Sequence, residues 1–256
     1  MPDLGTGWKK DLPDVNDKPI TKMGAIQAIT TIPEQTNMEE HLPTPYNQGG
    51  SSSCTGQSAS GAIYTSWGAQ AAINRRIPST RWLYSIGRGV TGTEEVDEGT
   101  YIRDVFKAAK ILGVAPATVW PFSVEKVNER PDWATFRAAH DQKTLNGYYR
   151  IATVGAARIL DIKRALAANH PVVFGLEIDA KWFDYTGGLL DEAKVIEGGH
   201  AMFLYGHFKD EFFWGQNSWG PGWGENGRYR IKQSALASIL ASDFWVIDAP
   251  HDSGTK

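Results

Sequence analysis

Apolar residues in the first half of the chain recur at three- and four-residue spacing, which is the spacing of one face of a helix. After Cys54 this spacing predicts a helix with one buried stripe, formed by Ala59, Ala62, Ile63, Tyr64, Trp67 and Ala71. A second helix is predicted over TYIRDVFKAAKILG, with Thr100 as its N-cap and Gly113 as its C-terminal stop. A third is predicted over DIKRALAANHP, with Asp161 as cap and Pro171 as terminator.

Beyond Pro171 the pattern changes to short runs rich in β-branched and aromatic residues. These runs are VVFGLEI, AMFLYGHF, FFWGQN, RYRIK and DFWVID, separated by turns that carry glycine or charge. Helices in the first half and strands in the second predict an α+β fold, with two lobes and a groove between them. Residues 1–32 are polar and broken by prolines, and we interpret them as an extended arm.

Composition narrows the class of protein. Hydrophobic residues make up 41% of the chain, charged residues 21%, and the net charge is −3, which does not favour nucleic acid or an anionic membrane as partner. The first 20 residues have no apolar core after their lysines, so no secretory signal is expected. A single cysteine cannot form an internal disulfide, which fits a reducing compartment. We expect a cytoplasmic protein, with association with a phage or other particle as the alternative.

The single cysteine follows a loop of glycines and serines in NQGGSSSCTGQS. Only a thiolate attacks well, and a thiol at a helix start lies among free backbone N–H groups that favour negative charge. Cys54 is therefore a candidate nucleophile. Cysteine is also one of the most buried residue types, so a small apolar core residue is the alternative.

A thiol nucleophile needs a base, and one histidine stands out among six. His200 follows two glycines at the entrance to an apolar strand, where its ring can project from the strand end. Asn217 follows a later aromatic strand and precedes Trp219. A buried Asn carbonyl can accept a ring N–H of histidine, and an aromatic cover strengthens that bond by excluding water. Polar stretches, a helix end or a strand end account for the others, His41, His140, His170, His207 and His251.

Three separated motifs resemble the papain-like cysteine peptidases. NQGGSSSCTG is similar to the family's nucleophile segment, in which the glutamine stands six residues before the cysteine, as Gln48 does before Cys54. GGHAMFLYG is similar to the strand that carries the catalytic histidine, and QNSWGPGWGENGRYRI is close to the family's Asn-Ser-Trp-Gly signature. The resemblance spans roughly residues 32 to 248.

The resemblance implies a cysteine endopeptidase that acts on peptide or protein substrates. Cys54 would form a thioester, His200 would act as general base and acid, Asn217 would orient the ring under Trp219, and Gln48 would stabilise the oxyanion. No metal or other cofactor is expected. The residues it implies for substrate binding are Gly99, Thr100, Tyr101, Gly175, Ala201 and Ser242.

The family also implies a domain division, and the sequence departs from the family at several points. An arm or short pro-segment would span 1–32 and the peptidase domain 33–256, with a helical lobe at about 46–145 and a β lobe at about 146–250. Ser51 and Thr55 replace a cysteine and a tryptophan beside the nucleophile, and Gly199 stands where Asp or Asn is common before the histidine. The usual disulfides and the long inhibitory propeptide are not expected, as in bacterial or phage branches of the family.

Two alternatives keep the same fold. One is a weak or inactive protein whose groove holds a peptide or its own arm, and Thr55 beside Cys54 favours it. The other is an acyl transferase, in which an amine in place of water resolves the thioester on the same Cys-His-Asn site. A redox thiol lacks a resolving cysteine. The sequence does not indicate an oligomeric state.

Overall fold

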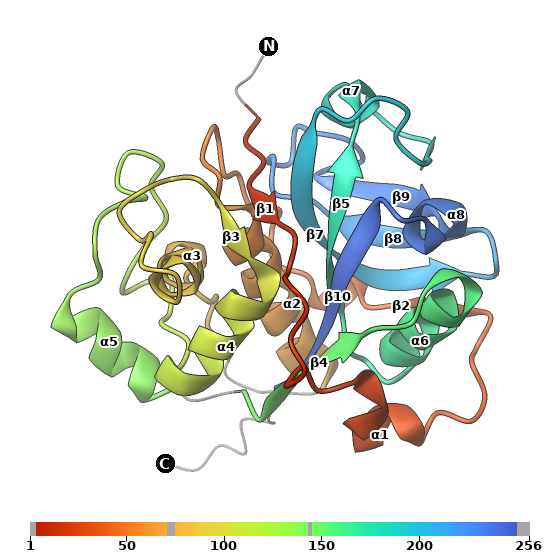
Figure 1. The fold of residues 1–256 in the computed structure, drawn as a ribbon, viewed down its shortest axis with the longest axis horizontal. Helices are drawn as coiled ribbons and strands as arrows, with labels where there is room; N and C mark the ends of the chain where they lie inside the picture. The colour runs from red at the N-terminus through yellow and green to blue at the C-terminus, as the bar shows by residue number, and fades with distance from the viewer. Residues whose placement is uncertain (1–3, 71–74, 143–144, 250–256) are drawn as a thin grey trace.

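The helices between residues 54 and 140 lie on one side of the molecule, and the main sheet lies on the other together with the helices after residue 154 (Figure 1). The protein is described from a computed structural model, covering residues 4–70, 75–142 and 145–249. The helices are α1 (Gly24–Gln27), α2 (Cys54–Ala69), α3 (Thr80–Gly89), α4 (Ile102–Leu112), α5 (Trp133–His140), α6 (Gly155–Ala167), α7 (Ala180–Phe183) and α8 (Gln233–Ala237), with 3-10 turns η1 (Ile20–Lys22) and η2 (Glu39–His41). Among them none is long and apolar enough to cross a membrane.

The main sheet has eight strands in the order β4-β10-β5-β7-β8-β9-β6, with β2 added against β7. Its strands are β2 (Gln35–Asn37), β4 (Gly147–Ile151), β5 (Val172–Ile178), β6 (Leu189–Leu190), β7 (Gly198–Phe208), β8 (Phe212–Gln216), β9 (Arg228–Lys232) and β10 (Ala241–Asp248). All its pairs are antiparallel except β6 with β9. Buried β-branched and aromatic residues on β5, β7 and β10 form its core.

Helix α2 lies between the helices and the sheet, and it is buried on nearly every face. Small residues make this possible, because a side chain larger than hydrogen would collide with a neighbour on each side. A Cβ on Gly56 would lie 2.6 Å from the Thr80 carbonyl oxygen, and one on Gly61 would lie 2.4 Å from Cε1 of Phe203 on β7. The close packing of α2 against β7 brings the start of the helix beside the sheet.

Most predicted elements are confirmed, and two predicted caps are wrong. Strands β5 and β9 coincide with the predicted runs, and Gly113 ends α4 in a left-handed conformation (φ 89°). Thr100 is not the cap of α4, because it belongs to strand β3 (Thr100–Tyr101) and the helix begins two residues later. Asp161 lies inside α6, where it accepts a hydrogen bond from Thr153, because that helix begins six residues earlier, at Gly155. Of the predicted stripe of α2, Ala71 lies outside the described residues.

The N-terminal segment crosses the molecule between the helices and the sheet (Figure 1). Its strand β1 (Trp8–Lys9) pairs in parallel with β3. It is not extended throughout, because η1 and α1 interrupt it. Residues from distant parts of the chain therefore meet where β1 passes α2, β3 and β7.

Candidate active site

The loop before α2 is fixed by side-chain hydrogen bonds. Both carboxylate oxygens of Asp97 accept from the backbone N–H of Ser52, at 3.0 and 3.1 Å, and the Asp97 carbonyl accepts from the Ser52 hydroxyl. Tyr84 donates its hydroxyl to the same carboxylate at 2.7 Å. Because this loop leads directly into Cys54, the first residue of α2, these bonds fix where the helix begins.

Backbone N–H groups surround the sulfur of Cys54. The amides of Ala201, Thr55 and Cys54 itself are placed to stabilise negative charge on it. Since Ala201 directly follows His200, the thiol lies beside the histidine-bearing strand β7. Burial outweighs these groups: Cys54 is completely buried, and burial raises the pKa of its thiol to about 12. In this state the thiol is neutral.

His200 is held on two sides. Its Nε2–H donates to Oδ1 of Asn217 at 2.7 Å, and the Trp219 ring stacks on the imidazole with centroids 4.5 Å apart. Nδ1 is buried and has no hydrogen-bond partner among the described residues. The Asn217 bond therefore leaves Nδ1 as a proton acceptor. Burial lowers the pKa of His200 to about 4, a shift that the bond to Asn217 only partly opposes, so the ring is neutral as well.

Gln48 is completely buried and uses both ends of its side-chain amide. Oε1 accepts from the Ser218 hydroxyl at 2.6 Å, which links Gln48 to the residue after Asn217. Nε2 donates to the Ser51 carbonyl at 2.7 Å and to the Gly5 carbonyl at 3.1 Å. The structure thus brings Gln48, Cys54, His200 and Asn217 into one site.

The N-terminal arm lies across this site. The Gly5 carbonyl also accepts from the Trp219 indole at 2.9 Å, and the Gly5 N–H donates to the Gly49 carbonyl at 2.9 Å. Gly7 bridges the two sides of the cleft, because its N–H donates to the Gly199 carbonyl and its carbonyl accepts from Thr100, both at 3.1 Å.

Two arm glycines fit only because they lack a side chain. A Cβ on Gly5 would lie 1.9 Å from the Ser51 carbonyl oxygen, and one on Gly7 would lie 2.2 Å from that of Ser52. Gly7 also has a φ of 135°, which disfavours other residues. The sequence of the arm is therefore matched to the cleft that it fills.

Three of the residues implied for substrate binding line the helical side of the arm. Thr100 pairs with Trp8 and Tyr101 with Lys9 in the β1–β3 ladder. Gly99, at φ 79°, lies so close to the arm that a Cβ would be 1.9 Å from the Gly7 carbonyl oxygen.

The other three lie on the sheet side, on neighbouring strands. Gly175 on β5 is opposite Ala201 on β7 and Ser242 on β10. The Trp8 ring covers Gly175 so closely that a Cβ on this glycine would lie 1.9 Å from Cε2 of the ring. The indole N–H of Trp8 reaches Asp243, one residue beyond Ser242.

Sequence reasoning missed the anchors of the arm. Asp243 accepts from the Trp8 indole at 3.1 Å and from the Asp11 N–H at 2.7 Å, and Trp245 donates its indole N–H to the Asp11 carboxylate at 2.8 Å. The Arg150 guanidinium forms ion pairs with Asp243 at 3.0 Å and with Asp17 of the arm at 2.7 Å. The available signal was Trp8 itself, the only aromatic residue in the first 32, preceded by the glycines of LGTGW.

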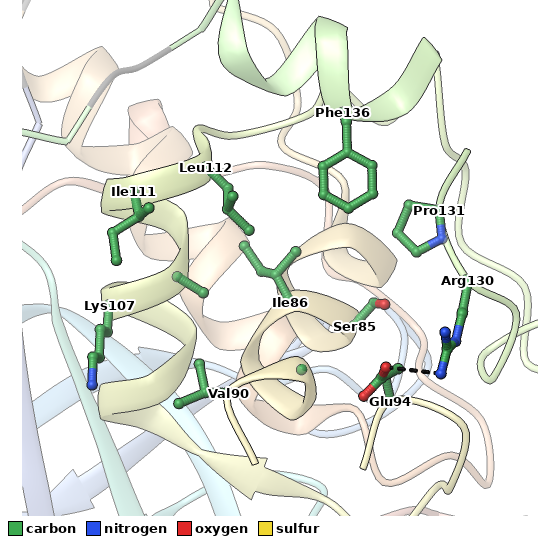
Figure 2. A pocket seen from close by; sticks show the side chains of 12 residues that line it. Ser85, Ile86, Val90, Glu94, Lys107, Ile111, Leu112, Arg130, Pro131 and Phe136 are labelled. Carbon is green, nitrogen blue, oxygen red and sulfur yellow. Dashed lines mark ion pairs between the residues drawn. The ribbon is translucent and has the colours of Figure 1, made fainter. Parts of the chain in front are cut away.

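One hollow adjoins the site and another lies apart from it. A cavity of about 520 Å³ beside Trp219 is also bordered by Leu4, Asn47, Phe183 and Trp223, among others. A separate hollow of about 470 Å³ lies between α3, α4 and α5. Figure 2 shows that mainly apolar side chains line it, with the Glu94–Arg130 ion pair at one side. The second hollow contains no residue of the site.

The chain matches the papain family cysteine proteases over residues 32–243. It belongs to the papain family. The α+β, two-lobe fold that the sequence predicts is that of this family, and it is confirmed by solved structures. Xylellain, a cysteine protease from Xylella fastidiosa, is 26% identical with a TM-score of 0.84 and covers 97% of both chains.

Other papain-family relatives agree. An uncharacterized peptidase C1-like protein of Acanthamoeba polyphaga mimivirus is 29% identical over 251 residues, which are 93% of this chain and 78% of the relative. Digestive procathepsin L 3 of the Tenebrio molitor larval midgut is 18% identical, with a TM-score of 0.72 over 96% of this chain and 76% of the other. That second likeness shows the fold alone.

Proposed function

We propose that this papain-family member is a cysteine endopeptidase that cleaves peptide bonds through a thioester on Cys54. Nδ1 of His200 takes the thiol proton, the sulfur attacks the peptide carbonyl carbon, and His200 returns the proton to the leaving amine. Water then resolves the thioester. The observation that carries this proposal is the 2.7 Å bond from His200 to Asn217 under Trp219, because it keeps Nδ1 available as a base.

The carbonyl oxygen becomes negative during attack, and two donors can stabilise it once the arm has left. They are the side-chain N–H of Gln48 and the backbone N–H of Cys54. Gln48 is suited to this role because Ser218 fixes its Oε1 and thereby directs Nε2 toward the cleft. Such donors act strongly because they are already oriented before the charge develops.

The arm keeps the peptidase closed in this proposal. Its Gly5 carbonyl takes the Gln48 N–H that the oxyanion needs, and the covered thiol and imidazole are both neutral. When the arm leaves, water reaches both groups, and the loss of burial moves their pKa values back toward the ordinary range. The thiolate–imidazolium pair then becomes accessible. The 520 Å³ hollow beside Trp219 would receive the leaving-group side of the substrate.

The occupied cleft also favours a second function, a peptide-binding protein without turnover. Its groove already holds a peptide, the segment Gly5–Trp8 of its own chain. Acyl transfer uses the same residues as hydrolysis, and product masses with and without an added amine distinguish these two reactions.

A peptide-library cleavage profile of the full-length chain tests the proposal. The chain carrying Gly7→Ala, which loosens the arm, should cleave peptides, and the further substitution Cys54→Ala or His200→Ala should abolish cleavage. Gly24→Ala is the matched control, because nothing lies within 4 Å of its added Cβ. Peptide binding without cleavage by the Gly7→Ala chain would refute the peptidase and support the binding protein.

A further inference from the structure

The Trp8 side chain of the arm fills a pocket that exists because two glycines face it. Gly175 on β5 and Gly199 on β7 both face the indole, and a Cβ on Gly175 would lie only 1.9 Å from Cε2 of Trp8. A Cβ on Gly199 would lie 3.0 Å from Cε3. Trp8 is 8% exposed, so the pocket takes nearly the whole ring. These two glycines therefore admit a two-ring aromatic group beside the strand end that bears His200.

A carboxylate lies at the edge of this ring. The β10 strand has a register shift between Ser242 and Trp245, and Asp243 within it has a left-handed φ of 53°. Irregularities of this kind redirect side chains out of the regular alternation of a strand. Here the Asp243 carboxylate, whose side chain is completely buried, accepts the indole N–H of Trp8 at 3.1 Å.

We propose that Asp243 determines specificity at this pocket, and that the pocket takes a substrate tryptophan through its indole N–H. The inference rests on the proposed peptidase function, because it concerns the peptide that replaces the arm. Once the arm leaves, Asp243 loses the two donors on its Oδ2, the Trp8 indole and the Asp11 N–H. A substrate indole restores one of them, whereas a phenylalanine ring leaves a buried carboxylate oxygen without a donor.

The neighbouring charge disfavours lysine and arginine in the same pocket. Arg150 donates to the other oxygen of Asp243 at 3.0 Å. With the arm gone, Arg150 also loses Asp17, so Asp243 becomes its remaining carboxylate partner among the described residues. The pocket thus offers a hydrogen-bond acceptor whose charge is already compensated. A second cation would be buried without a matching anion.

The first test measures the pocket without catalysis. Cys54 is the only cysteine, so alkylation by iodoacetamide reports how often the arm leaves. Trp8→Phe keeps an aromatic ring but removes the N–H, and it should speed alkylation roughly tenfold to a hundredfold. Gly89→Ala, whose Cβ meets nothing within 4 Å, is the control and should not change the rate. An unchanged rate in Trp8→Phe overturns the role of Asp243.

The second test measures the substrate. Paired peptides carry either tryptophan or benzothienylalanine, which has the same shape with sulfur in place of the N–H, and both are given to the chain with Gly7→Ala. The tryptophan peptide should have the higher kcat/KM by on the order of tenfold or more. Asp243→Asn should reduce that preference. Equal cleavage of the two peptides overturns the tryptophan specificity but not the peptidase function. If neither peptide is cleaved but the tryptophan peptide slows alkylation of Cys54 by iodoacetamide, only the peptidase function is refuted.

Discussion

The carbonyl oxygen of Gly5 accepts a hydrogen bond from the side-chain amide of Gln48 at 3.1 Å. The same oxygen accepts from the Trp219 indole at 2.9 Å, so two donors in the site hold one arm carbonyl. A substrate carbonyl that needs Gln48 must displace it. The contact between these residues therefore links access to the site with the position of the arm.

Gly5→Ala should open the cleft. The added Cβ would lie 1.9 Å from the Ser51 carbonyl oxygen, so the arm must shift away from the loop before Cys54. Overpacking of this kind costs about 1–3 kcal/mol, which corresponds to roughly tenfold to a hundredfold faster alkylation of Cys54. Stopped-flow or mass-spectrometric alkylation measures it, with Gly24→Ala expected to match the wild-type rate.

Gln48→Ala should change two rates in opposite directions. In the chain with Gly7→Ala, which loosens the arm, peptide cleavage should fall by roughly 10²–10³ because one oxyanion donor is lost. Alkylation of Cys54 should become faster, because it forms no oxyanion and the arm loses its bond to Gln48. Steady-state kinetics and alkylation are measured on the same sample, with exposed Gln35→Ala as control. A parallel fall in both rates would indicate general damage to the fold instead.

In the chain with Gly7→Ala, the further change Asn217→Ala should reduce kcat while leaving the fold intact. Without Oδ1 as acceptor, His200 is no longer restricted to the tautomer with hydrogen on Nε2. The expected loss in kcat is roughly tenfold to a hundredfold, with a smaller change in KM. The exposed Asn146→Ala is the control. An unchanged kcat on adding Asn217→Ala would contradict the orienting role.

Acid should hold the arm in place. Burial and the neighbouring Asp243 raise the pKa of Asp11 to about 7 from 3.8 in the docked arm. A raised pKa means that docking takes up a proton, so its stabilisation is complete below about pH 4 and is lost as the pH rises to about 7. Alkylation of Cys54, corrected for reagent reactivity and thiol ionisation, should therefore rise over this window.

Asp11→Asn isolates that effect. The amide carries no proton equilibrium, so the corrected alkylation rate should lose its rise between about pH 4 and 7. Asp14→Asn is the matched control in the same arm, because hydrogen bonds from Asn16 lower the pKa of Asp14. A wild-type pH profile in Asp11→Asn would show that another group controls the arm.

Gly61→Ala should destabilise the junction that positions Cys54 beside His200. Its Cβ would lie 2.4 Å from Cε1 of Phe203, so α2 and β7 must separate or repack. We expect a loss of about 1–3 kcal/mol in the free energy of unfolding, measured by urea denaturation. Gly89→Ala, with nothing near its Cβ, should not lose stability.

The sequence pattern predicted the elements whose position depends on their own apolar residues. Strands β5 and β9 matched their sequence runs because their buried faces require β-branched and aromatic residues. The caps failed at Thr100 and Asp161, because pairing with the arm makes Thr100 part of a strand, and α6 extends beyond its apolar stripe. In both places tertiary contacts outweigh the local preference of the residue.

The catalytic candidates could be predicted because each stands in a motif, whereas the arm contacts could not. Asp243 and Trp8 are separated by 235 positions and meet only because a strand irregularity redirects one of them. Gly199 is a departure from the family pattern in the sequence, and its reason became visible only with Trp8 against it. Nothing in composition or spacing indicates that contact.

The recess that holds Trp8 is bounded by the α-carbons of Gly175 and Gly199, so no substitution at these positions can enlarge it. Every other amino acid at Gly175 or Gly199 adds atoms to the space that Trp8 occupies. Any substitution at these two positions therefore makes the pocket smaller and restricts it to smaller substrate side chains. The same substitution would also displace the Trp8 indole from the pocket. A mutation that restricts the range of substrate peptides would therefore also free the active site from the N-terminal arm.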